Sequence, residues 1–111
     1  MDQNKPYYDE CPNIKALNFL GGKWRLPIIL ILFDGNLRYN QLKKRLTGIT
    51  NIMLTRSLHD LEEHGLINRI QHSEMPPHVE YAITDHAKKL APAIRLINEW
   101  VKEHVELMSR R

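Results

Sequence analysis

The sequence predicts a mainly α-helical fold that carries one small β-hairpin. Gly35, Gly48 and Gly65 each follow an apolar-periodic stretch of helical length, and glycine adopts the left-handed backbone that ends a helix at the least cost. After Gly65 the apolar period changes to two, the period of a strand. The three glycines therefore mark three helix ends, and the last one precedes the hairpin.

Two helices are expected in the N-terminal third. The first begins at residues 11–12 and ends before the glycine pair at 21–22, because proline suits a first helical turn. The second runs from Lys23 or Trp24 to Asp34 and is apolar nearly all round, which predicts a central place in the core. Pro27 inside it predicts a late start or a slight bend.

The next two helices are joined by a short turn. Residues 40–46 form the first, with Asn40 as the expected N-cap and Leu42 and Leu46 facing inward. A three-residue turn through Gly48 leads to Thr50, which caps a helix to His64. Its leucines at 54, 58 and 61 recur every three or four residues and predict a core stripe.

The remaining chain predicts the hairpin and a helical end. Residues 66–71 and 78–83 are the expected strands, and 73–77 the loop, in which Pro76-Pro77 bars ladder pairing. Thr84 then caps a helical stretch that Pro92 should bend or restart.

Length and composition limit the class of protein. A chain of 111 residues, 42% apolar and 26% charged, predicts one globular domain over 1–111 and excludes disordered, fibrous and two-domain classes. We divide it into an N-terminal helix (10–22), a core (23–83) and C-terminal helices (84–111). The longest apolar stretch, 28–33, is too short for a bilayer and no secretory signal opens the chain, so we expect a cytoplasmic protein without a membrane partner.

The basic residues are concentrated in one segment. Between Lys15 and Arg56 eight bases face one acid, Asp34, a net charge of +7, whereas the rest of the chain carries −4. The eight bases are Lys15, Lys23, Arg25, Arg38, Lys43, Lys44, Arg45 and Arg56. This asymmetry favours a polyanionic partner.

The pair of helices around Gly48 has the layout of a helix-turn-helix, and the hairpin behind it that of a wing. Small polar and cationic side chains face outward from the second helix, opposite its leucines. Asn51, Thr55 and Arg56 are the candidate base-reading residues, and Arg56 can make a forked contact to guanine. The candidate phosphate contacts are Lys23, Arg38, Lys43, Lys44, Arg45, His59, Arg69, His72 and His78.

Two other interpretations are weighed against DNA binding. A basic helix face is often no more than a solvated surface, but here charge bias, helix spacing and hairpin agree. A winged helix can also serve protein–protein assembly alone, without sequence-specific DNA binding. Such a module has no need to concentrate bases on its recognition side.

Seven short motifs carry a resemblance to a known family. They are C-P at 11–12, G-G-K-W at 21–24, D-G at 34–35, R-Y-N-Q-L at 38–42, I-T-N-I-M-L-T at 49–55, L-E-E-H-G-L-I at 61–67 and P-P-H-V-E-Y at 76–81. Over residues 11–101 the chain closely resembles the HxlR family of bacterial winged-helix transcriptional regulators.

The resemblance implies a homodimer that binds a pseudo-palindromic operator, with the helix after Thr50 as recognition helix. The residues on the family's recognition positions are Asn51, Ile52, Thr55 and Arg56. Ile52 departs from the family, which often carries lysine there, so apolar contact with a thymine methyl replaces a phosphate or base contact.

The C-terminal stretch independently predicts a dimer. One apolar stripe comprises Leu90, Ile94, Ile97, Val101, His104 and Met108, and an adjoining one Ala93, Leu96, Trp100 and Leu107. We expect one stripe to cover the chain's own core and the other to meet a partner; the alternative is one broad face that packs within the monomer. The expected interface residues are Ile14, Leu17, Ile94, Ile97, Trp100, Val101, His104 and Met108.

Cys11, the single cysteine, has two interpretations. A helix N-terminus and Lys15 would favour its thiolate, whereas Asp9 and Glu10 oppose it. Members of the resembling family with a cysteine at this position include sensors of oxidants and electrophiles, which makes such a small molecule the candidate effector. The alternative is a small packing residue.

Neither a metal site nor an enzyme is expected. His59 and His64 lie about 140° apart around a helix, and His72 and His78 flank a loop without a carboxylate or thiolate at a fixed metal spacing. Solvated or phosphate-contacting histidines are therefore expected, and no cofactor. We find no nucleophile–base pair, phosphate-cradling glycine loop or paired carboxylates for one cleft.

Overall fold

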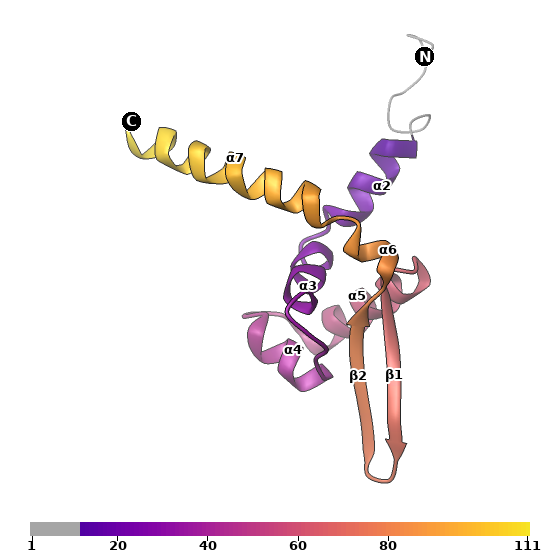
Figure 1. Cartoon of the computed structure of the whole chain (residues 1–111). Coiled ribbons are helices and arrows are strands. Elements are labelled where there is room, and N and C mark those ends of the chain that lie inside the picture. Colours follow the sequence, from indigo (N-terminus) through magenta and orange to yellow (C-terminus); the bar gives the residue numbers. More distant parts are fainter. Residues whose placement is uncertain (1–11) are drawn as a thin grey trace.

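The computed structural model describes residues 12–111, which form six helices and one two-stranded antiparallel sheet (Figure 1). The helices are α2 (Pro12–Leu20), α3 (Arg25–Leu32), α4 (Tyr39–Arg45), α5 (Asn51–Glu63), α6 (Asp85–Lys88) and α7 (Ala91–Ser109). The strands are β1 (Ile67–Glu74) and β2 (Pro77–Ile83). The predicted mainly helical winged fold is confirmed.

The core lies among α3, α4, α5 and the inner end of the hairpin. The leucines of α5 at 54, 58 and 61 are buried, as are Leu42 and Leu46, which confirms the predicted stripes. They pack with Ile28, Ile29 and Leu32 of α3. Since α3 begins only at Arg25, Pro27 stands in its first turn, where the missing N–H would have no partner within the helix. The predicted late start is confirmed.

The two helix starts of the helix-turn-helix are capped differently. The Thr50 hydroxyl accepts a hydrogen bond from the Met53 N–H at 3.1 Å, as predicted for α5. The prediction of Asn40 as N-cap of α4 is wrong, because α4 begins at Tyr39 and its N-cap is Arg38, two residues earlier. The Arg38 backbone N–H donates to Gln41 Oε1 at 2.8 Å, and Tyr39 packs against the core, which favours this earlier start.

The hairpin is longer than the sequence predicts. Ser73 and Glu74 pair with His78 and Pro77, so a loop over 73–77 is wrong. Pro77 is tolerated because it is the first residue of β2, at the end of the ladder. Between Gln71 and Ser73 the register shifts, which leaves His72 as the extra residue of a β-bulge. Leu37 bridges Tyr81 through two backbone hydrogen bonds and ties the hairpin to the segment before α4.

The C-terminal helices divide where proline requires it. The Thr84 hydroxyl caps α6 by accepting from the Ala87 N–H at 3.1 Å, and Pro92 restarts the chain as the second residue of α7. No residue of α7 is buried, and the helix extends away from the other elements (Figure 1). Ile94 is half-buried and lines a hollow with Leu30 and Phe33 of α3, but every residue from 95 to 111 is exposed. The expectation that a whole stripe of α7 covers the chain's own core is therefore wrong, and so is the alternative of one broad face that packs within the monomer.

Thr50→Ala should lower the free energy of unfolding by about 1 kcal/mol, because the Met53 N–H loses its side-chain acceptor. Thr47→Ala, in the exposed turn three residues earlier, is the matched control and should change it by less than about 0.5 kcal/mol. Urea unfolding followed by circular dichroism measures both. Equal losses in the two variants would contradict the role of Thr50.

Candidate nucleic-acid interface

The outward face of α5 is polar and open. Asn51, Ile52, Thr55, Arg56 and His59 together line a shallow depression on the surface. All are exposed, and Ile52 keeps 71% of its surface accessible. Because the leucines of the same helix are buried on the opposite side, its rotation is fixed with these five residues outward, as the sequence predicts.

Tyr39 of α4 holds two of these residues, a contact that sequence reasoning missed. Its hydroxyl lies 3.1 Å from Asn51 Oδ1 and 3.3 Å from Thr55 Oγ1. Its single proton is shared between Asn51 Oδ1 and the Asn51 backbone carbonyl, which lies 3.2 Å away, so the hydroxyl accepts from Thr55. The Asn51 side-chain oxygen therefore faces Tyr39. The only sequence signal was the tyrosine of the R-Y-N-Q-L motif.

A second hollow joins α5 to the loop before α3. It is lined by Lys23, Trp24, Arg25, Arg56 and Asp60 among others, so Arg56 borders both hollows and Lys23 belongs to the same side of the molecule. Arg25 differs from these two, because it pairs with Asp60 at 3.0 Å and donates to the Phe19 carbonyl at 3.0 Å. Its charge serves the packing of α3 on α5.

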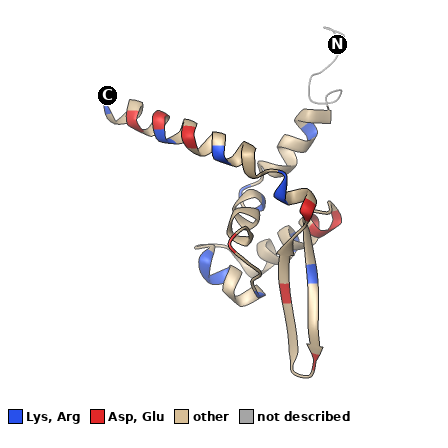
Figure 2. Ribbon diagram, viewed as in Figure 1, with Lys and Arg blue, Asp and Glu red and all other residues tan. Residues whose placement is uncertain are grey.

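Helix α4 carries a cationic end. Lys43, Lys44 and Arg45 form its last turn, where cations interact favourably with the helix dipole, and the first two line an open hollow with Asn40. Arg45 lies 3.9 Å from Asp34, with half its side chain exposed. Figure 2 shows this basic turn apart from the acidic C-terminal end of α5.

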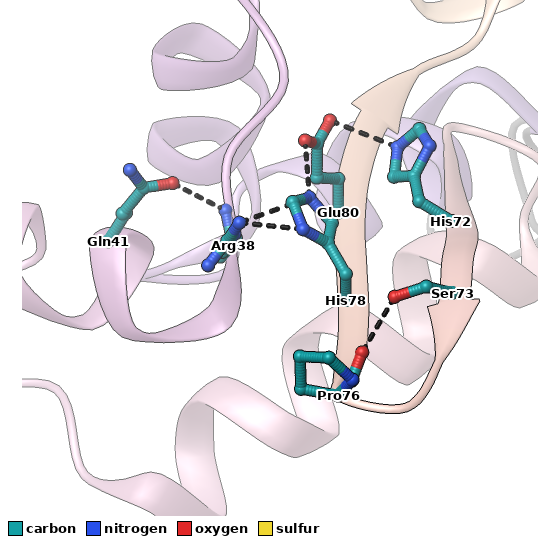
Figure 3. A network of polar contacts seen from close by, with 7 residues as sticks. All are labelled: Arg38, Gln41, His72, Ser73, Pro76, His78 and Glu80. Carbon is teal, nitrogen blue, oxygen red and sulfur yellow. Dashed lines mark hydrogen bonds and ion pairs between the residues drawn. The ribbon is translucent and has the colours of Figure 1, made fainter.

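The wing carries a chain of polar contacts around Glu80 (Figure 3). Arg38 donates to His78 Nδ1 at 2.6 Å, and His78 Nε2 lies 2.9 Å from Glu80 Oε1. His72 Nε2 lies 3.4 Å from Glu80 Oε2. The hydrogen bond from His78 holds the pKa of Glu80 below its ordinary value, and the charge of His72 acts in the same direction.

Three of the predicted phosphate contacts belong to this network. Arg38 contacts His78, and both His72 and His78 meet the Glu80 carboxylate. Arg69 of β1 is exposed, as expected. Sequence reasoning missed Glu80 because it predicted a loop over 73–77. The strand pairing that brings His72 beside Glu80 was therefore not foreseen.

The predicted interface residues lie on α2 and α7. Leu17 is 61% exposed and Ile14 half-buried. On α7, Ile97 and Trp100 are 54% and 60% exposed, and the Trp100 ring stacks on His104 at 4.7 Å between centroids. Ile94, Val101 and Met108 share their side of the helix.

Cys11 lies outside the described residues. In residues 12–111 no helix is long and apolar enough to cross a membrane.

A helix-turn-helix with an exposed polar face on its second helix, followed by a hairpin, defines a winged helix-turn-helix transcriptional regulator. The chain belongs to the HxlR-like helix-turn-helix family, whose pattern matches residues 19–109.

Individual proteins agree with this assignment. An uncharacterised HTH-type transcriptional regulator of Methanothermobacter thermautotrophicus is 44% identical over 92 residues, 83% of this chain and 70% of that one. The solved structure of the HTH-type transcriptional regulator YtcD of Bacillus subtilis has a TM-score of 0.82 and 33% identity, over 86% of this chain and 98% of that one. The redox regulator HypR in its reduced form has a TM-score of 0.81 and 30% identity, over 91% and 100%. These relatives are regulators, and no catalytic family is indicated.

Proposed function

We propose that this transcriptional regulator binds a pseudo-palindromic DNA operator sequence-specifically as a homodimer, with α5 in the major groove. The observation that carries the proposal is the outward face of α5, where Asn51, Ile52, Thr55 and Arg56 stand exposed while the leucines behind them are buried. A rigid helix with a fixed polar face suits the major groove, which admits one α-helix.

The contacts of Tyr39 support a particular way of reading bases. With Asn51 Oδ1 accepting from Tyr39, the Asn51 NH₂ offers two donors to acceptors such as guanine O6 and N7 or thymine O4. Arg56 makes the forked contact to guanine, and Ile52 provides apolar contact to a thymine methyl. Tyr39 acts as a positioning residue for this surface.

The phosphate contacts come from around this surface. Lys43 and Lys44 stand at the end of α4, Lys23 borders the hollow that Arg56 lines, and Arg45, His59 and Arg69 are exposed. Arg38, His72 and His78 are engaged around Glu80 and contribute only when that network opens. The concentration of bases on the side of α5 favours DNA over the alternative, a winged helix used only for protein assembly.

Arg56→Ala and Lys44→Ala should weaken operator binding in different ways. Loss of the guanine contact should cost about 1–3 kcal/mol and relax specificity at one position per half-site, whereas Lys44→Ala should weaken all sequences equally and lower the salt slope by about 1. Operators selected from a random duplex library, then titrated between 50 and 200 mM salt, measure both.

Each variant serves as the control for the other, because Arg56→Ala should change sequence preference and Lys44→Ala should not. If Arg56→Ala leaves the ranking of mismatched operators unchanged, the base-reading role of Arg56 is wrong. A flat salt response of the unaltered protein would favour the assembly alternative, because phosphate contacts release counterions.

The uncovered apolar side of α7 supports the homodimer. At about 100° per residue, the apolar residues between Ile94 and Met108 fall on one half of the helix, with Ile97 at its centre. An isolated apolar half-cylinder is costly in water, and aromatic residues such as Trp100 are enriched in interface centres. On α2, the half-buried Ile14 and the exposed Leu17 extend the same proposed interface.

Ile97→Asp should dissociate the dimer, since association would bury an unpaired carboxylate. Ser109→Asp adds the same charge to the polar side of α7 and should leave the dimer intact. Sedimentation at low micromolar concentration measures both. A dimeric Ile97→Asp variant would place the interface elsewhere.

Cys11 is proposed as a redox-responsive residue. Three considerations support it: the cysteine immediately precedes Pro12, the first residue of α2; a helix N-terminus favours the thiolate; and the similar protein HypR is a redox regulator. With no second cysteine in the chain, the oxidised product is a disulfide to a small thiol or to the partner's cysteine.

Diamide with glutathione should convert Cys11 to a mixed disulfide and change operator affinity. Diamide accepts one electron and one proton from the Cys11 thiol, and one electron and one proton from the glutathione thiol. The two sulfur atoms then form the disulfide bond. Mass spectrometry confirms the adduct, and Cys11→Ser, treated alike, should keep its affinity. An unchanged affinity of fully modified protein would reduce Cys11 to a packing residue.

A further inference from the structure

We propose that His72, His78 and Glu80 form a binding site on the wing for a divalent transition-metal ion of the zinc type. This site goes beyond DNA binding and does not depend on it. Two imidazoles and one carboxylate are ligands that zinc prefers, and three protein ligands leave a fourth position for water. Sequence reasoning excluded a metal at the histidine pair because it found no carboxylate beside them.

The ligand atoms already stand close to coordination distances. His78 Nε2 and Glu80 Oε1 are 2.9 Å apart, and His72 Nε2 and Glu80 Oε2 are 3.4 Å apart. Tetrahedral zinc with bonds near 2.05 Å separates its ligands by about 3.3 Å. All three residues offer ligand atoms within 4.8 Å of one another. Side-chain rotation alone can therefore close the site.

The β-bulge accounts for the gathering of the three side chains. His78 and Glu80 are two residues apart on β2 and share one face of the hairpin. His72 is the extra residue between two paired positions, Gln71 with Val79 and Ser73 with His78. A bulge re-aims a side chain, and bulges are enriched at functional sites. Figure 3 shows both rings turned toward the Glu80 carboxylate.

Metal binding must displace the Arg38 side chain from His78. Arginine only donates, and one Arg38 nitrogen lies 2.6 Å from His78 Nδ1 and 3.3 Å from Nε2. With the nearer Nδ1 accepting from Arg38, the ring proton is on Nε2 and is directed at Glu80. Coordination through Nε2 moves that proton to Nδ1, where it meets the Arg38 donor. Metal and Arg38 therefore compete for His78, and a bound metal releases the Arg38 side chain from the wing.

A second group of His59, Asp60 and Glu63 on α5 also lies within 4.8 Å. It is the weaker candidate, because Asp60 is already paired with Arg25 at 3.0 Å. His59 therefore provides a matched control, as an exposed histidine beside carboxylates that is not a proposed ligand.

The test is a calorimetric titration of the full chain with Zn²⁺ alone, without an affinity tag and in a Cys11→Ser background. We expect one zinc ion per chain from this site. His72→Ala, His78→Ala and Glu80→Gln should each lower the affinity at least tenfold, and His59→Ala should leave it within twofold. Arg38→Ala should raise the affinity severalfold, because the competing donor is gone.

Long-range proton–nitrogen spectra of the imidazoles provide the second readout. Zinc should shift the ring nitrogens of His72 and His78 and leave those of His59 and His86 in place. Absence of saturable zinc binding would overturn the site. So would a zinc affinity of the His72→Ala, His78→Ala and Glu80→Gln variants equal to that of the unaltered protein. An unchanged affinity in Arg38→Ala would overturn the competition for His78.

Discussion

Burial of the leucine stripe of α5 is the interaction on which the rest of the structure depends. Leu54, Leu58 and Leu61 are almost wholly removed from solvent against α3 and α4, and each such side chain contributes about 1.5–3 kcal/mol. Turning α5 about its axis would expose them, so the helix has one favourable rotation. That rotation sets which residues meet a ligand, and Tyr39 then fixes the side chains of two of them.

Local patterns predicted most of the fold because each follows from a short range of sequence. The sequence predicts Thr50 and Thr84 as caps, Pro92 as a restart and the periodic leucines as core, since a cap or a stripe depends on neighbours within one or two turns. Predictions were wrong where contacts with residues distant in the sequence determine where an element begins or ends. Tyr39 packs on the core and starts α4 early, and the register of the hairpin continues to Glu74 and Pro77.

The candidate site likewise contains residues that local patterns predict and residues that depend on distant parts of the chain. The outward residues of α5 followed from helical geometry alone, whereas Tyr39 contacts residues 12 and 16 positions away and Arg25 pairs with a residue 35 positions away. Glu80 meets His72 only through the register of the hairpin. A count of basic residues treats Arg25 and Arg38 like Lys44, but Arg25 is neutralised by Asp60 and Arg38 is held by His78. The usable positive charge near α5 is thus smaller than the composition implies.

The projecting helix α7 has a consequence for how this protein responds to its own abundance. Its 19 residues extend for about 28 Å, and from residue 95 onward every side chain of the helix is exposed. A helix of this kind gains tertiary stabilisation only from whatever covers it, and such stabilisation grows with the concentration of the covering molecule. With a second copy as the cover, thermal stability becomes a function of protein concentration, and dilution melts the C-terminal helix before the leucine core.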